Sequence, residues 1–421
     1  MPAIGRFSRD VIWNFVSVVI LGISGFALNI IIGRYYGPEA FGIFSLVLAV
    51  YYIFSQLAVG GFVFSSLSLV AQSAGDDRQV RQIISTGLAL TAALALVVCV
   101  AAALLSARIG HLFHSDAVRR GLLWTIPGLW FFAINKVILF SANGLRHMRF
   151  YAVGNSLRFV LIVVSLIVLT LLRVDAALLP MCLSTGEVVL LPVLAIYLFR
   201  RYPPTFGAGS GFWFRRHLHF GGRAFFSGLL MDINLKVDVI LLGYYLSDRA
   251  VGIYNFAAML AIEGLYQFVV MIQVNMNPLL SRLKPEERLV EVKKYVRRAT
   301  RILCPALAGA SCLIALLYPH LTIWLTGHQE FAAGWIYFAI LMTGVVIGSC
   351  YLPLLFLLNQ WGHPAWFMTF LFTIVATNFI LNAVLIPVFG AVGSAIGTAI
   401  SYVMTIVYIK LYTRLAVGIS I

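Results

Sequence analysis

Eight charged side chains interrupt long apolar runs, and they are the residues of this chain best suited to chemistry. Four are basic, Arg34, Lys136, Arg158 and Lys236, and four are acidic, Glu187, Asp232, Asp238 and Glu263. Guanidinium and ammonium groups in apolar surroundings bind anions, phosphates in particular. A carboxylate in the same surroundings favours a bound proton or cation. Such residues usually face a wet cavity or a partner, so the set predicts a basic, partly acidic interior with candidate substrate-binding cations and candidate ion-coupling acids.

Helical spacing separates the charges of one run into two faces. Asp232 and Lys236 are four residues apart, so they share a face and can neutralise each other without any role in transport. Asp238 lies on a different face, where it serves either in ion coupling or as a cap near a helix end. Asp238 and Glu263 are our preferred coupling pair, because neither lies four residues from a lysine.

Motifs for enzymatic chemistry are absent from the sequence. None of the six lysines follows a glycine, so no phosphate-binding GxxxxGK[ST] loop exists, and neither GxSxG nor HExxH occurs. The five cysteines form no CxxC pair, and the two histidine pairs at 111–114 and 217–219 lie at charged loop edges without a recognised metal-ligand pattern. We expect no cofactor, no metal site and no enzymatic activity.

The composition predicts an integral membrane protein. Of the 421 residues, 61% are hydrophobic and 11% are charged, against about 25% charged in a soluble domain. At about 20 apolar residues per span, the chain holds about twelve transmembrane helices. We place them at 11–33, 39–74, 80–105, 118–141, 150–172, 175–199, 221–243, 250–281, 295–318, 332–358, 365–386 and 391–413.

Basic residues are distributed unequally between the two sides of these spans. One side, which includes both termini and the 200–220 and 282–294 loops, carries 22 of them, and the other carries 6. Because basic loops stay in the cytoplasm, both termini are expected there. The net charge of +15 therefore reflects topology, and nucleic acid is not an expected partner.

A shift of 210 residues superimposes GRYYGPEAFGIF at 33–44 on GYYLSDRAVGIY at 243–254. Gly42 falls on Gly252, and each stretch follows the first span of a six-span half. An even number of spans gives the halves the same orientation. We expect an all-α fold of two parallel six-helix lobes around a central cavity, with an N-terminal lobe at 1–199, a cytoplasmic linker at 200–220 and a C-terminal lobe at 221–421.

Four stretches resemble the bacterial O-antigen and exopolysaccharide flippases, the polysaccharide transporter branch of the multidrug/oligosaccharidyl-lipid/polysaccharide exporter superfamily. They are NFVSVVILGISGFALNIIIGRYYGPEAFGIFSL at 14–46, ANGLRHMRFYAVGN at 142–155, DVILLGYYLSDRAVGIYNFA at 238–257 and NAVLIPVFGAVGSAIGTAIS at 382–401. LAVGGFV at 57–63 departs from the family, which often has an acidic residue before this glycine. An acidic side chain at the end of the second span is therefore not expected to act here.

The resemblance implies the substrate and the setting. The substrate would be an oligosaccharide on undecaprenyl diphosphate, moved across the bacterial cytoplasmic membrane by ion-coupled alternating access for O-antigen, capsule or exopolysaccharide synthesis. H⁺ or Na⁺ would be the coupling ion, and membrane lipids, a polysaccharide polymerase and a chain-length regulator would be partners. A diphosphate needs cations in a hydrated cavity, which agrees with the basic residues above.

Two other functions remain open at this stage. A drug or small-molecule antiporter on the same scaffold would be expected to have a cavity dominated by acids, whereas this chain has Lys136 and Lys236 among its acids. An integral-membrane polymerase or ligase would need a large outer loop, and no expected outer loop exceeds about a dozen residues.

Overall fold

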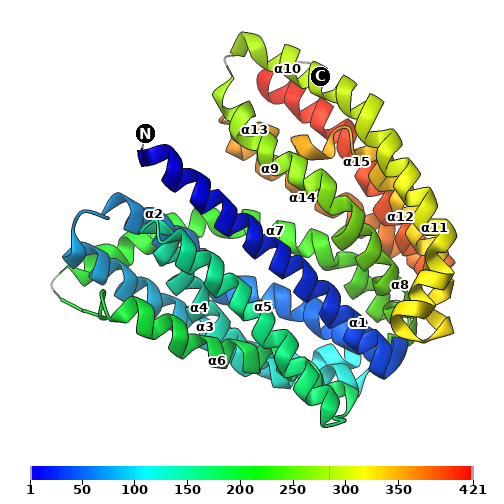
Figure 1. Cartoon of the computed structure of the whole chain (residues 1–421), viewed down its shortest axis with the longest axis horizontal. Coiled ribbons are helices and arrows are strands. Elements are labelled where there is room, and N and C mark those ends of the chain that lie inside the picture. The colour runs from blue at the N-terminus through cyan, green and yellow to red at the C-terminus, as the bar shows by residue number, and fades with distance from the viewer. Residues whose placement is uncertain (1, 208, 284, 419–421) are drawn as a thin grey trace. The chain divides into compact units, whose positions relative to one another are not determined.

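The computed structural model describes residues 2–207, 209–283 and 285–418. In this part of the chain every regular element is a helix. The helices of the N-terminal half are α1 (Pro2–Val59), α2 (Phe62–Gln72), α3 (Asp77–Leu112), α4 (Asp116–Gly144), α5 (Met148–Leu171), η1 (Ala176–Leu178), α6 (Met181–Phe199) and α7 (Ser210–Tyr245). Figure 1 shows them in chain order from blue to green.

The C-terminal half is more segmented. It contains α8 (Asp248–Ala258), η2 (Met259–Leu265), α9 (Tyr266–Arg282), α10 (Pro285–Arg298), η3 (Ala299–Leu303), α11 (Cys304–Thr326), η4 (Gln329–Gly334), α12 (Trp335–Gly348), η5 (Leu352–Leu354), α13 (Leu357–Gln360), α14 (Pro364–Phe389) and α15 (Ala391–Val417). The elements η2 and η3 are π-helical turns inside longer helical runs.

Ten helical runs among the described residues are long and apolar enough to cross a membrane. One of them, Ile12–Val59, contains the first predicted span and the start of the second, because α1 continues through a kink at Gly37. Gly37 adopts φ 78°, which favours glycine, and Pro38 then starts the second half of the helix. The kinked run of α1 corresponds to two predicted spans, and the seventh predicted span, 221–243, lies inside α7, which is not among the ten runs. The prediction of an all-α membrane protein with about twelve spans is therefore confirmed.

The chain divides into two compact units. Unit 1 comprises 1–36 and 46–232, and unit 2 comprises 37–45 and 233–421. In unit 1, α4 packs against α3 and α6, and α5 packs against α6 (Figure 1). Leu69, Ile83, Ile138 and Leu194 contribute to its core. In unit 2, α15 packs against both α12 and α14.

The start of α7 belongs to unit 1, although the sequence suggested a linker at 200–220. Trp213 and Tyr202 are part of the unit 1 core. One helical turn after Trp213, His217 is fully buried. Its Nδ1 lies 2.7 Å from Ser65 Oγ, and its Nε2 lies 3.0 Å from the carbonyl oxygen of Ile83.

The two copies of the internal repeat pack against each other. A methyl group at Gly42 would overlap the carbonyl oxygen of Asp248, and one at Gly252 would overlap that of Pro38. Asn255 donates a hydrogen bond of 2.8 Å to Ser45 Oγ. The 210-residue shift exchanges the first two contacts, since it maps Pro38 onto Asp248 and Gly42 onto Gly252, and Ser45 and Asn255 are themselves 210 residues apart. The crossing is therefore locally two-fold symmetric.

Candidate functional site

One face of α4 gathers polar and aromatic side chains inside unit 1. Phe132, Asn135, Lys136 and Phe140 recur at spacings of three and four residues, which places them on one side of the helix. Asn135 is fully buried and Lys136 is half-buried. The neighbouring helices α5 and α6 contribute the remaining charges of this cluster.

Arg158 of α5 and Glu187 of α6 form a buried ion pair. Arg158 Nε lies 2.7 Å from Glu187 Oε1, and the two residues are 3% and 1% exposed. Asn135 donates to Glu187 Oε2 at 2.8 Å and to the Glu187 carbonyl oxygen at 2.9 Å. Within the described residues, Arg158 Nη2 has no hydrogen-bond partner. The guanidinium therefore keeps a donor available although its charge is paired.

Lys136 contributes a second positive charge next to this pair. Its Nζ lies 5.4 Å from the ring centroid of Phe132 and 5.6 Å from that of Phe140. The guanidinium carbon of Arg158 lies 4.9 Å from the same Phe132 ring. In the part of the chain that the structure describes, Lys136 forms no ion pair. Two cations and one carboxylate leave the cluster with a net positive charge, which suits an anion.

Unit 2 contains a separate polar network centred on Asp238. This residue of α7 is 5% exposed. Its Oδ2 accepts a hydrogen bond of 3.0 Å from Tyr254 Oη of α8, and its Oδ1 accepts one of 2.8 Å from the backbone N–H of Val239. Asp238 is therefore a buried, hydrogen-bonded carboxylate within a predicted span, and its role in ion coupling stays a prediction.

Amides and a hydroxyl of α14 and α15 form a second polar chain in unit 2, which reaches α7 at Asn234. Asn378 of α14 donates to the carbonyl oxygen and the Oδ1 of Asn234, both at 3.3 Å. Asn382 donates to Asn378 Oδ1 at 2.9 Å, and Ser394 of α15 donates to Asn382 Oδ1 at 2.7 Å. These residues were missed in the sequence, where the spacing of four between Asn378 and Asn382 in an apolar run was the available signal.

The remaining predicted site residues lie on α7, in the turn η2 and on α1. Glu263 is exposed, sits in the π turn η2, and forms no hydrogen bond or ion pair within the described residues; in particular, none joins it to Asp238. Asp232 and Lys236 are half-buried on α7, and each makes an interaction. Arg34 is exposed and interacting, just before the Gly37 kink. Their roles stay predictions.

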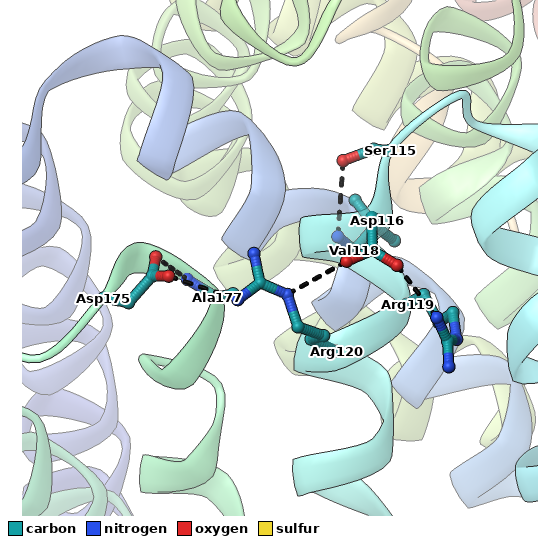
Figure 2. Close-up of polar contacts among 7 residues, drawn as sticks. All are labelled: Ser115, Asp116, Val118, Arg119, Arg120, Asp175 and Ala177. Carbon is teal, nitrogen blue, oxygen red and sulfur yellow. Dashed lines mark hydrogen bonds and ion pairs between the residues drawn. The ribbon is translucent and has the colours of Figure 1, made fainter.

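Arginines on the predicted outer side are neutralised by nearby carboxylates. Figure 2 shows Arg120 between Asp116 and Asp175, with N–O distances of 3.2 Å and 3.3 Å. Arg119 pairs with Asp116 at 3.0 Å in the same group. These side chains are exposed, so they link the starts of α4 and η1 at the surface of unit 1 and do not form an anion site.

The described residues contain no cluster of three or more His, Cys, Asp or Glu side chains able to hold a metal ion. The polar oxygen atoms described in unit 2 belong to one carboxylate, to amides and to two hydroxyls. Such ligands suit a proton or a hard cation better than a transition metal.

A family described as polysaccharide biosynthesis protein matches residues 7–274. The chain belongs to this family. No curated protein matches the chain. The match covers α1 to α8 and most of α9, so it includes the cationic cluster of unit 1 and both Asp238 and Glu263.

Solved structures of membrane transporters share the fold of this family member. A lipid II flippase MurJ in an inward closed conformation has a TM-score of 0.76 at 13% identity, with 96% of this chain and 87% of that chain covered. A multidrug resistance MATE family transporter of the MOP superfamily, in an inward-facing conformation, has a TM-score of 0.71 at 16% identity, with 96% and 98% covered. A mutant of the Vibrio cholerae MATE transporter VcmN has a TM-score of 0.63 at 13% identity, with 99% and 97% covered.

Proposed function

We propose that this protein translocates undecaprenyl-diphosphate-linked oligosaccharide units from the cytoplasmic to the outer leaflet of the bacterial cytoplasmic membrane. The observation that carries the proposal is the cationic cluster of unit 1, in a member of a polysaccharide biosynthesis family whose fold matches a lipid II flippase. The protein acts as a transporter rather than an enzyme. Its product serves the synthesis of O-antigen, capsule or exopolysaccharide.

Lys136 and Arg158 of the cluster would contribute differently to the recognition of a diphosphate. Lys136 has no carboxylate partner among the described residues, so its charge remains available to a substrate phosphate. Arg158 is fixed by Glu187 and supplies the unpartnered Nη2 donor. We therefore assign Glu187 to holding Arg158 in place, because removing either partner of a buried ion pair leaves an uncompensated charge. Lys236 of α7 and Arg34 of α1 are further proposed substrate-binding residues.

Ion coupling is assigned to Asp238 together with Glu263. A proton or cation can bind the Asp238 carboxylate only if the Tyr254 hydroxyl moves away from it. Ion binding would therefore change the contact between α7 and α8. Glu263 is exposed within the candidate span Asp248–Arg282, and a carboxylate at that depth faces water in preference to lipid. Asp232 stays a secondary candidate. The coupling ion is H⁺ or Na⁺.

The setting follows from the same proposal. Both termini lie in the cytoplasm, membrane lipids surround the spans, and a polysaccharide polymerase and a chain-length regulator receive the product on the outer side. No nucleic acid takes part.

A complementation experiment tests the substrate. Cells that lack the gene should accumulate complete lipid-linked repeat units in the cytoplasmic leaflet, and the wild-type gene should clear them. Lys136→Ala should fail to restore export while the protein remains folded in the membrane, and Lys136→Arg should restore part of it. Normal export by both Lys136→Ala and Lys236→Ala would overturn the cationic-site assignment.

The alternative is a drug or small-molecule antiporter, which the likeness to the multidrug transporters favours. Under this alternative, deletion would change drug susceptibility and leave polysaccharide and its lipid-linked precursors unchanged. A fixed cation next to a buried arginine suits a phosphate-bearing substrate, which is why we favour the flippase.

A further inference from the structure

A basic groove of about 520 Å³ follows one face of α10 and the π turn η3 in unit 2. It is lined by Val290, Lys293, Lys294, Arg297, Arg298, Arg301 and Ile302. All seven side chains are exposed. Nothing in the proposed transport cycle uses this groove, because its cations belong to a helix separate from those of the unit 1 cluster and the Asp238 network.

The groove results from the spacing of side chains along α10 and from the geometry of the π turn η3. Residues 290, 294, 297 and 301 recur every three or four positions and so share a face. The π turn Ala299–Leu303 holds more residues per turn than an α-helix, which rotates Arg301 and Ile302 relative to the preceding turns. The opposite face fixes the helix, since Val292 and Ala299 are buried. The cationic face is therefore held outward.

The length of the helical run places the groove beside the hydrocarbon core rather than in it. The candidate span Leu289–Thr326 contains 38 residues. At about 1.5 Å per residue it is about 57 Å long, against about 30 Å of hydrocarbon. The apolar part from Cys304 onward fills the core. The basic part then lies at the headgroups, on the side where the 22 basic residues are expected.

The charges of the groove have little internal compensation. Lys294 lies 3.5 Å from Glu291, an exposed pair. Within the described residues, Lys293, Arg297, Arg298 and Arg301 form no ion pair. Four uncompensated cations within nine residues attract phosphate esters, and the aliphatic side chains of Val290 and Ile302 at the two ends of the groove suit acyl chains.

We propose that this groove binds the phosphate headgroup of an anionic membrane phospholipid, such as phosphatidylglycerol, in the cytoplasmic leaflet. The lipid would hold α10 and the start of α11 at the membrane surface. The proposal goes beyond the proposed transport function and does not rest on it, because lipid binding can be measured on the purified protein without any substrate or gradient.

The test measures binding of short-chain phospholipids to the full-length protein in a neutral detergent. The wild-type protein should bind dioctanoyl phosphatidylglycerol more tightly than dioctanoyl phosphatidylcholine, and added salt should weaken the difference. The variant K293Q/R297Q/R301Q should lose at least tenfold in affinity for phosphatidylglycerol. The matched control R78Q/R200Q/R215Q removes three exposed arginines of unit 1 and should stay within twofold of wild type.

A further variant and a competition experiment distinguish a lipid site from misfolding, from general surface charge and from a site for free phosphates. Val290→Asp keeps all five cations and adds a carboxylate to the groove. It should weaken phosphatidylglycerol binding as much as the triple variant does. Agreement between the two variants would show that the triple variant loses affinity because of its charge and not because it fails to fold. Equal loss in the control would mean general surface charge and would overturn the site. Competition by inorganic pyrophosphate at the concentration of the lipid would indicate a site for free phosphates, and would overturn the lipid assignment.

Discussion

At the scale of single residues, the sequence predicts which charged side chains belong to the candidate site, but it does not predict which of them contact each other. Arg158 and Glu187 were assigned separate roles, one in substrate binding and one in ion coupling. In the structure they contact each other across α5 and α6, with Asn135 as a third member. Pairing across helices depends on tertiary packing, which helical periodicity does not contain.

The buried ion pair predicts a large difference between two glutamate substitutions. Glu187→Gln leaves Arg158 buried without its counter-charge, which should reduce the stability of the folded protein by about 3 kcal/mol. Glu330→Gln breaks the exposed pair with Arg249, at 2.8 Å, and should cost less than about 1 kcal/mol. Thermal unfolding in detergent compares the two variants. Equal effects would contradict a structural role for Glu187.

At the scale of elements, periodicity and apolar length located the helices, whereas features that depend on local backbone geometry were missed. The π turns η2 and η3 have no signature in the amino-acid sequence. The sequence predicts a linker at 200–220, a long stretch between two apolar spans that includes the start of α7. Trp213 and His217, four residues apart, nevertheless share a buried face in unit 1.

His217 makes the attachment of α7 sensitive to pH. Burial lowers the pKa of His217 from 6.5 to about 4, and the residue precedes the predicted span. The unfolded state binds the proton more readily, so stability is fully present above about pH 6.5 and falls as the pH drops toward about 4, by at most about 1.4 kcal/mol per pH unit. Thermal unfolding of wild type should show this slope, and His217→Gln should reduce it. An unchanged slope would contradict the attachment.

The repeat crossing predicts another contrast. Gly42→Ala or Gly252→Ala would push a methyl group into a backbone carbonyl, which should cost about 1–3 kcal/mol or more. Gly309→Ala in α11 has open space around it and should be neutral or stabilising by up to about 1 kcal/mol. Thermal stability and the yield of folded protein measure both effects. Tolerance of alanine at Gly42 and Gly252 would mean that the helices do not cross this closely.

At the scale of the whole molecule, the fold class and family resemblance were predictable because hydrophobic length, basic asymmetry and internal repeats are global properties of a sequence. The amide and hydroxyl chain of α14 and α15 was unpredicted, because Asn378 lies 144 residues from its partner Asn234 in the sequence. Uncharged polar residues also resemble ordinary packing residues when they occur singly in an apolar run.

Topology can be checked by cysteine labelling of intact cells, in a chain whose five native cysteines are replaced by alanine. His114→Cys and Gln329→Cys should react with an impermeant maleimide, and Gly211→Cys should react only after permeabilisation. His114 is exposed, whereas the neighbouring Ser115 caps α4 and is only 8% exposed. The reverse pattern would place the termini outside and contradict the basic-residue argument.

The most direct measurement of the central claim uses the purified protein in lipid vesicles that contain a fluorescent undecaprenyl-diphosphate-linked oligosaccharide. An impermeant glycosidase outside the vesicles reports the rate at which the labelled lipid crosses the bilayer. The rate should rise well above that of protein-free vesicles and should respond to an H⁺ or Na⁺ gradient. Lys136→Ala should abolish crossing, and Asp238→Asn should remove the response to the gradient. Equal rates in vesicles with and without the folded protein, under every gradient, would contradict the proposed function.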